Sequence, residues 1–235
     1  DASGTVKILT DSVDGERMIF VEDLAIARDG MIYFSDASTR HAYGTDLLEI
    51  YEGRPTGRLV SYNPATNETR ILLDKLYFAN GVALSRDEDF ILVNETFRPR
   101  ITRYWLLGEK AGTHEVFIDR LPGFPDGVSH GLDSDTFWVA LFAPRNRLLD
   151  FTADKPWLRR IIFHLPRALQ PEPAHIAGVM GIKPNGTVVT DLRDDREGAF
   201  APITSVEEQG NTLYLGSLSA DAFARMPRPT PETTP

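Results

Sequence analysis

Three side chains with oxygen atoms, those of Glu22, Asn80 and Asp126, occur at matching places in three similar stretches of the chain. Each stretch continues as a short apolar alternation, a turn that contains Asp, and a second apolar strand, as in VEDLAIARDGMIYFSD, ANGVALSRDEDFILVNE and PDGVSHGLDSDTFWVAL. Carboxylate and amide oxygens are the ligands that a hard cation such as calcium prefers. If these side chains meet in the folded protein, they are candidate calcium ligands.

The spacing of these residues indicates how they meet. They are 58 and 46 residues apart, close to the roughly 40–50 residues of a propeller blade, which is a small antiparallel sheet. The innermost strands of a propeller face one central axis, so residues that lead successive inner strands converge there. The sequence therefore predicts an all-β protein, a β-propeller with a central site.

An alternative explanation exists for two of the three positions. Asn80-Gly81 and Pro125-Asp126-Gly127 are ordinary turn formers when they stand between apolar segments. Either one, taken singly, is better explained as a turn than as a ligand. Glu22-Asp23 is no turn former, yet it stands at the same offset in its stretch. The repetition is the argument for a shared site, and the turn explanation stays open beside it.

Two residues after Asp126 suggest further chemistry. His130 lies four residues past Asp126 and is a candidate proton carrier, with a polar residue at a strand end as the alternative. Ser129 fits the G-x-S-x-G pattern in GVSHG, but a nucleophile elbow requires a strand, a sharp turn and a helix. Ser129 is followed by turn residues and the strand TFWVAL. We therefore predict a chance match, with a serine esterase as a weak alternative.

Composition excludes several classes of protein. The net charge is −9 with no block of Lys or Arg, which argues against binding to nucleic acid. No apolar run approaches the roughly 20 residues that span a bilayer, so we expect no transmembrane segment. The chain has no cysteine, which excludes disulfides and thiolate metal sites. The compartment stays open.

Turn signals divide the rest of the chain into short strands, the first expected at Thr5 to Leu9. Strand pairs that flank Pro184-Asn185-Gly186 and Gln209-Gly210-Asn211 are expected to be further blades. Their register puts Gly178 and Ile203 near the place where the other repeats have Glu22, Asn80 and Asp126, and neither offers an obvious ligand.

Two segments, Ala42 to Gly53 and Asp154 to Arg167, break the strand rhythm and are expected to be short helices or structured loops. In the second, Trp157, Ile161 and Leu165 follow helical spacing. We expect this apolar stripe to pack against the blades, since amphipathic helices usually bury an apolar face.

Four long runs of the chain are distinctive: IYFSDASTR, GRLVSYNPATNETRILLDKLYFANGVALS, ITRYWLLGEKAGTHEVFIDRLPGFPDGVS and LYLGSL. They resemble the conserved region of the strictosidine synthase-like family, in the branch that includes the adipocyte plasma membrane-associated protein. This family neighbours the gluconolactonase and paraoxonase calcium propellers. The resemblance covers the chain to about Ala224 and implies a six-bladed propeller.

Such a propeller is longer than this chain. The resemblance therefore implies a six-bladed fold truncated at the N-terminus to about four to five blades, with a further metal-binding Glu in the missing portion. We expect one propeller domain over residues 1–226 and a disordered tail, rich in Pro and Thr, over residues 227–235.

The resemblance also implies roles for single residues. Asn80, in FANGV, and Asp126, in GFPDGV, match the calcium-binding Asn and Asp of the hydrolytic relatives. Glu22, in FVEDL, stands where the family usually has Asn, and Gly127 replaces a common Asn. The expected function is calcium-dependent hydrolysis of a small-molecule ester or lactone, with Asp126 and His130 as catalytic residues. The alternative is a noncatalytic propeller that binds a protein partner or a small ligand.

True strictosidine synthases join an amine to an aldehyde without metal and use a Glu that aligns with Thr204 here. A hydroxyl group cannot replace a carboxylate as an acid or base at neutral pH. Metal-free condensation is therefore the weaker alternative. Glu207 and Glu208 are nearby but out of register, and we expect them to be solvated turn residues.

Overall fold

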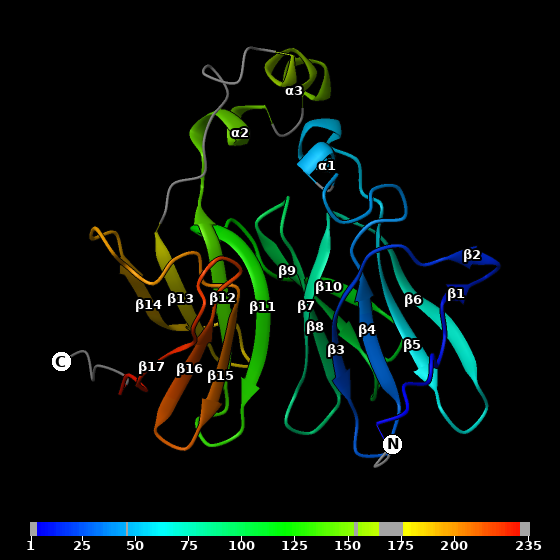
Figure 1. Ribbon diagram of the computed structural model, residues 1–235. Helices are drawn as coiled ribbons and strands as arrows, with labels where there is room; N and C mark the ends of the chain where they lie inside the picture. Colours follow the sequence, from blue (N-terminus) through cyan, green and yellow to red (C-terminus); the bar gives the residue numbers. More distant parts are fainter. Residues whose placement is uncertain (1–3, 46, 153–154, 165–175, 231–235) are drawn as a thin grey trace.

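Four antiparallel sheets stand around a common axis in the computed structural model, which describes residues 4–45, 47–152, 155–164 and 176–230 (Figure 1). The first three sheets have four strands each, in chain order, and the fourth sheet has three. This is the predicted all-β propeller, seen here as four blades, within the four to five that were expected.

The first blade comprises β3 (Val21–Ile26), β4 (Ile32–Asp36), β5 (Gly57–Asn63) and β6 (Glu68–Leu76). The second comprises β7 (Ala79–Leu84), β8 (Phe90–Glu95), β9 (Arg100–Trp105) and β10 (His114–Ile118). The third comprises β11 (Gly123–Gly131), β12 (Thr136–Pro144), β13 (Ala177–Ile182) and β14 (Val188–Asp194). The fourth comprises β15 (Ser205–Gln209), β16 (Thr212–Gly216) and β17 (Ala224–Pro227). A small hairpin of β1 (Ser12–Val13) and β2 (Glu16–Arg17) precedes them.

The internal repeat corresponds to the inner hairpin of each of the first three blades. At its tip each hairpin has a residue with positive φ, at Gly30 (88°), Glu88 (57°) and Asp135 (48°). Positive φ is the conformation that tight hairpin turns require. Each of the three turns therefore contains a residue in the left-handed region, although only one of these residues is glycine.

The core lies between neighbouring blades. On the wholly buried β8, Ile91 and Val93 belong to a cluster with the first blade, whereas Leu92 belongs to a cluster with the third. On β12, Val139 packs toward the second blade and Trp138 toward the fourth. Successive side chains of a strand point to opposite faces, so a central strand that is apolar at every position is what a blade packed on both sides requires.

Two strand predictions were wrong. Thr5 to Leu9 forms no strand, and Val6 is 91% exposed. The strands flanking Pro184-Asn185-Gly186 are β13 and β14, the outer half of the third blade and not a separate one. Gly178 therefore lies two strands away from the inner strand β11, whereas Ile203 does precede an inner strand, β15.

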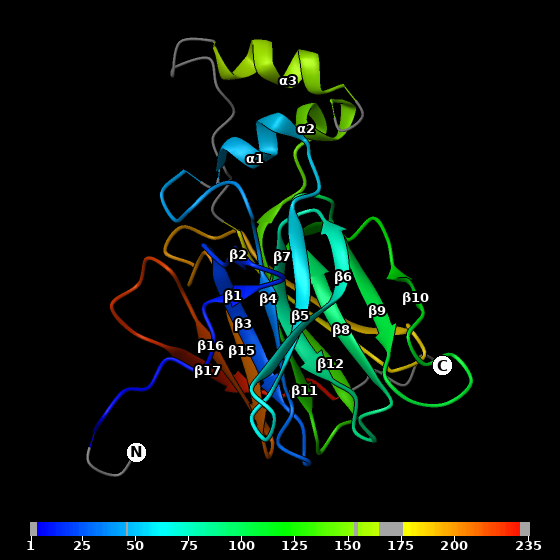
Figure 2. The same cartoon turned by 90° about the vertical axis from the view of Figure 1, so that its right-hand side faces the viewer.

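Three helices gather at one end of the sheets (Figures 1 and 2): α1 (Leu47–Glu52), α2 (Arg147–Phe151) and α3 (Pro156–Phe163). The first and third fall in the two segments expected to be helical. The packing predicted for the apolar stripe was wrong, because Trp157 is 65% exposed and Ile161 is 53% exposed. Leu165 lies outside the described residues.

Part of the expected tail belongs to the fourth blade. Pro227 pairs with Thr212 in the sheet, and the Arg228 amide donates to the Asn211 carbonyl oxygen at 2.8 Å. Residues 231–235 lie outside the described part of the chain. None of the described helices is long and apolar enough to cross a membrane.

Candidate functional site

The inner strands of all four blades contribute to one pocket of about 470 Å³, here called the central pocket. Its lining includes four carboxylates and five aromatic rings, with no Lys, Arg or His among the described residues that line it. The carboxylates are those of Glu22, Asp23, Asp126 and Glu207, and the rings are those of Phe20, Tyr43, Phe78, Phe97 and Phe142. The pocket is therefore acidic on one part of its wall and apolar on another.

Glu22, Asn80 and Asp126 all line the central pocket, from β3, β7 and β11. The side chain of Asn80 hydrogen-bonds to the Asp126 carboxylate. Burial and, after it, the nearby charges of Glu22 and Asp23 together raise the pKa of Asp126 to about 7, against the effect of the Asn80 hydrogen bond. Two carboxylates and an amide thus meet at the pocket wall, as oxygen donors of the type that calcium takes.

The second blade holds Asp126 in place through its backbone. The Asn94 side-chain amide donates to the Asp126 carbonyl oxygen at 2.6 Å, and the Thr96 hydroxyl donates to the Pro125 carbonyl oxygen at 2.7 Å. Asn94 is fully buried and Thr96 nearly so. Because buried polar groups are costly to leave unpaired, these bonds fix the start of β11 against β8.

Asp23 was not among the predicted ligands, yet it lines the same pocket. Its carboxylate accepts backbone hydrogen bonds from Val82, at 2.8 Å, and from Leu24, at 2.9 Å. Burial raises its pKa, although both amide hydrogen bonds act in the opposite direction. The sequence could have predicted Asp23 as a site residue, because Glu22 and Asp23 are adjacent acidic residues at the start of a repeat.

Gly81 and Gly127 are required by the close approach of the inner strands and not by turns. A Cβ atom on Gly81 would lie 2.4 Å from the Val128 nitrogen, and one on Gly127 would lie 2.7 Å from the Thr204 carbonyl oxygen. The Gly127 amide donates to that same Thr204 oxygen at 2.9 Å. Asn80 and Asp126 are therefore inside strands, and the turn explanation was wrong for both.

Glu207 and Glu208 lie in β15 and not in a turn, and Glu207 is exposed as expected whereas Glu208 is buried. Glu207 lines the central pocket, where partial burial raises its pKa and a hydrogen bond with Ser129 lowers it. Glu208 is buried and accepts hydrogen bonds from the Trp138 indole nitrogen at 2.6 Å and from the Ser134 amide at 3.0 Å. Glu207 is thus a site residue that sequence reasoning missed, whereas Glu208 joins the third and fourth blades.

His130 lies on β11 but is not among the residues that line the central pocket. Its Nε2 is 3.0 Å from Asp135 Oδ1, and its ring packs on Phe137 with centroids 4.6 Å apart. Burial lowers its pKa, against the effect of Asp135. Ser129, its neighbour, sits inside the same strand and donates to the Val206 carbonyl oxygen at 2.6 Å, so the expected absence of a nucleophile elbow is confirmed.

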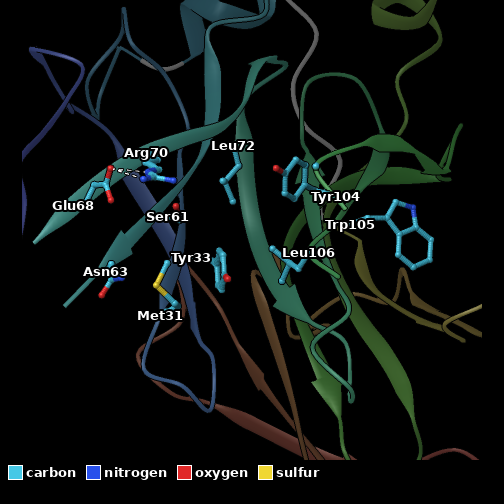
Figure 3. A pocket seen from close by; sticks show the side chains of 11 residues that line it. Met31, Tyr33, Ser61, Asn63, Glu68, Arg70, Leu72, Tyr104, Trp105 and Leu106 are labelled. Carbon is cyan, nitrogen blue, oxygen red and sulfur yellow. Dashed lines mark hydrogen bonds and ion pairs between the residues drawn. The ribbon is translucent and has the colours of Figure 1, made fainter. Parts of the chain in front are cut away.

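A second pocket, of about 340 Å³, lies between the first and second blades (Figure 3). Tyr33, Leu72, Tyr104 and Leu106 point toward one another across it, and the Glu68 and Arg70 ion pair stands at its edge. None of the predicted ligands lines this pocket. The residues with candidate chemistry are therefore those of the central pocket.

In the part of the chain that the structure describes, no group of three or more His, Cys, Asp or Glu side chains is placed to hold a metal ion. The set proposed from the sequence is of a different kind, since it has two carboxylates and an amide. Calcium takes six to eight oxygen ligands, so these three side chains fit a part of a calcium site and do not complete one.

Comparison with known proteins places the chain in context. Residues 22–109 match the family model described as strictosidine synthase. The adipocyte plasma membrane-associated protein of Rattus norvegicus is 36% identical over 94% of this chain, and strictosidine synthase-like 13 of Arabidopsis thaliana is 36% identical over 96%. The chain spans only 61% and 54% of those two relatives.

Solved structures show the same fold at low identity. A gluconolactonase from Xanthomonas campestris matches with a TM-score of 0.59 and 18% identity, over 92% of this chain and 60% of that one. A calcium-binding protein, regucalcin, from Agrobacterium tumefaciens matches with a TM-score of 0.50 and 14% identity, over 86% of this chain and 55% of that one. At these identities the likeness shows the propeller fold alone.

Proposed function

Because the chain is a strictosidine synthase-like β-propeller, we propose that it is a calcium-dependent hydrolase of a small lactone or ester. The observation that carries the proposal is the contact of Asn80 with Asp126 beside Glu22 in the central pocket. Proteins of the same fold described as a gluconolactonase and as a calcium-binding protein support it.

Asp126, Asn80 and Glu22 would hold the cation, with water, substrate and other protein oxygens as further ligands. The raised pKa of Asp126, to about 7, reflects burial and like charge at the site, which a cation would offset. When bound, calcium supplies a Lewis acid that polarises the carbonyl oxygen of the substrate. The protein's part is to fix the three oxygen donors, which Asn94 does for the Asp126 backbone.

The aromatic side and the acidic side of the central pocket have different effects on the substrate. Phe20 and Phe78 pack edge to face with centroids 5.3 Å apart, and Phe78 and Phe97 are 4.5 Å apart. This aromatic side can bury the apolar part of an ester or lactone and exclude water. The acidic side, including Asp23 and Glu207, disfavours an anionic substrate. The pocket therefore suits a neutral ester or lactone.

Glu207 is the better candidate for proton transfer. His130, the residue expected from the sequence, does not line the pocket and contacts Asp135. The Glu207 carboxyl lies in the pocket near Ser129 and Asp23, and its pKa is raised by burial. A carboxyl group whose pKa is raised is a more effective proton carrier than an ordinary one. We therefore assign the role of proton carrier to Glu207 in place of His130.

Calcium titration of the wild type, followed by thermal unfolding and by turnover of an aryl ester and a simple lactone, tests the proposal. Calcium at about 100 times its Kd stabilises the folded state by about 2.7 kcal/mol. Asp126→Asn should lose most of this shift and roughly 100-fold in kcat. Asp191→Asn is the matched control, since Asp191 pairs with Arg193 on β14. A wild type with no turnover and a calcium-independent Tm contradicts the proposal.

A noncatalytic propeller is the second candidate, and Gly127 favours it. The backbone of Thr204 fills the space where a side chain at Gly127 would stand, so one amide donor common in the hydrolytic relatives has no room here. Stabilisation by calcium or by a small ligand, without turnover of any ester or lactone, is the result that supports this candidate. Amine and aldehyde condensation remains the weaker alternative, with Thr204 lining the pocket where those enzymes carry a Glu.

A further inference from the structure

The pocket of about 340 Å³ between the first and second blades lies apart from the central pocket (Figure 3). We call it the interblade pocket. Strands β4, β5 and β6 of the first blade and β9 of the second supply most of its walls. Among the described residues the two pockets share no lining side chain. Its volume is within the range of pockets that hold small organic molecules.

The interior of the interblade pocket is aromatic and apolar. Two tyrosines and two leucines point toward one another across it in Figure 3, namely Tyr33, Leu72, Tyr104 and Leu106. All four pack against the core cluster that the first two blades share, so the fold fixes their positions. Tyrosine rings combine a large apolar face with a polar hydroxyl group. The pocket therefore offers apolar contact to a flat ring and hydrogen bonds to its substituents.

Three hydroxyl groups at the interblade pocket, those of Tyr33, Ser61 and Tyr104, have no hydrogen-bond partner among the residues that the structure describes. Ser61 is the most informative of them, because it is only 4% exposed. Its oxygen is nevertheless not one of the fully enclosed unpaired atoms in the described part of the chain, so it is reached from the pocket. Largely buried polar groups are normally paired. The Ser61 hydroxyl is thus available to a bound molecule.

The charge around the interblade pocket indicates a neutral ligand. Glu68 and Arg70 are the only charged side chains in its described lining, and they pair with each other at 2.7 Å. The pKa of Tyr33 is raised, first by burial and then by the charges of Asp29 and Glu88. The surroundings are therefore apolar and somewhat acidic, which disfavours an anion. A flat molecule with a carbonyl or hydroxyl group and no net charge fits these walls.

We propose that the interblade pocket is a second small-molecule site, which binds a neutral, flat ring compound that carries a carbonyl or hydroxyl group. The ring contacts Tyr33 and Tyr104, and the polar group hydrogen-bonds to the Ser61 hydroxyl. The inference does not depend on the proposed hydrolase activity, because the described lining of the interblade pocket includes none of the proposed calcium ligands.

Calorimetric titration with β-naphthamide, a neutral flat probe with a carbonyl group, tests the inference. The wild type should bind it with a Kd of about 1 mM or tighter, as expected for a ligand of this size. Ser61→Ala and Tyr104→Phe should each weaken binding about threefold to tenfold, the effect of one lost hydrogen bond. Both should keep the wild-type Tm, since these hydroxyls have no partner in the described fold. Tyr214→Phe, on β16 of the fourth blade, is the matched control and should bind like the wild type.

Two further comparisons separate the charge and the place of binding. The anion β-naphthoate, which has nearly the same shape, should bind at least tenfold more weakly than the amide. Leu72→Trp should fill the interblade pocket and abolish binding, whereas Phe97→Ala, in the wall of the central pocket, should not change it. Failure of the wild type to bind the amide, or equal binding of amide and anion, would overturn the inference. So would binding that survives in Ser61→Ala and Leu72→Trp but is lost in Phe97→Ala, which would assign the probe to the central pocket.

Discussion

The Asp23 carboxylate in the first blade accepts a hydrogen bond from the Val82 backbone amide in the second blade, at 2.8 Å. The bond joins the two inner strands beside the central pocket, and its acceptor is a side chain whose neighbour, Glu22, is a proposed ligand. On β3, Asp23 therefore holds the first and second blades together, and its neighbour Glu22 is available as a proposed calcium ligand. Burial raises the pKa of this half-buried carboxylate, and the Val82 and Leu24 amides oppose that rise because they stabilise the ionised form.

Replacement of Asp23 by Ala should destabilise the fold by about 1–3 kcal/mol, since it leaves the buried Val82 amide without its acceptor. Urea unfolding measures the change. Asp23→Asn keeps an acceptor oxygen and should cost less. Asp74→Ala, at an exposed side chain on β6, is the control and should stay within about 0.5 kcal/mol of wild type. Equal stability of Asp23→Ala and Asp74→Ala would show that the interblade bond contributes nothing.

Replacement of Gly81 by Ala should be more disruptive than its size suggests. The added methyl group would lie 2.4 Å from the Val128 nitrogen and 2.5 Å from the Asp126 carbonyl oxygen, so β7 and β11 must separate. We expect a loss of about 1–3 kcal/mol together with weaker calcium binding, because Asn80 and Asp126 move apart.

The control for that variant is Gly108→Ala, where a Cβ atom meets nothing within 4 Å but φ is +80°. Backbone strain alone should cost about 1 kcal/mol there and leave calcium binding unchanged. If calcium binding weakened equally in both variants, the effect at Gly81 would not be a local one.

Glu207→Gln should lower kcat roughly 100-fold if Glu207 carries the proton, and KM should change little. Since burial raises its pKa, the rate of the wild type should rise as pH increases through that raised value, as the carboxylate forms and acts as a base. The variant should lose this limb of the pH profile. Glu109→Gln, at an exposed position, is the matched control. A Glu207→Gln profile that keeps the limb would assign it to another group.

His130 should make stability depend on pH. Burial lowers its pKa in the folded state, so the unfolded chain binds the proton first as pH falls below about 6.5. Stability from this source is fully present above that pH and is lost progressively as pH falls toward the folded pKa. Asp135 opposes the shift, as Glu208 does, whereas Arg86 adds to it.

His130→Gln should therefore flatten the fall in unfolding free energy between about pH 7 and pH 5. Denaturant unfolding across that range measures the slope. His114→Gln, at an exposed position on β10, controls for the loss of a histidine. An unchanged slope in His130→Gln would mean that other groups set the acid sensitivity of the fold.

The sequence predicted the inner hairpins well because their signals are local. Alternating apolar residues and a turn with positive φ specify a hairpin within some fifteen residues, and β3, β7 and β11 were placed correctly as inner strands. Alternation does not tell which sheet a strand joins. The pair β13 and β14 was therefore mistaken for a new blade, although it completes the third.

Tertiary partners account for the other differences. Glu208 stands beside the turn Gln209-Gly210-Asn211, where a carboxylate is normally solvated, but Trp138 from the third blade supplies a buried donor. The helical spacing of Trp157 and Ile161 predicts that α3 has an apolar side, but it does not predict whether that side faces the protein or the solvent. Its direction is set by Arg159 and the carbonyl oxygen of Ile50, 109 residues away.

The contact between Gly127 and Thr204 limits how this propeller can change. Installing an asparagine at Gly127, to match the pattern of the calcium hydrolases, would push the fourth blade off the third, since the new side chain claims space held by a backbone oxygen. A side chain can therefore be introduced at residue 127 only if the distance between the third and fourth blades increases at the same time. Residue 127 thus links the proposed calcium site to the spacing of the third and fourth blades, and we expect single substitutions there to fail where substitutions paired with changes in β15 succeed.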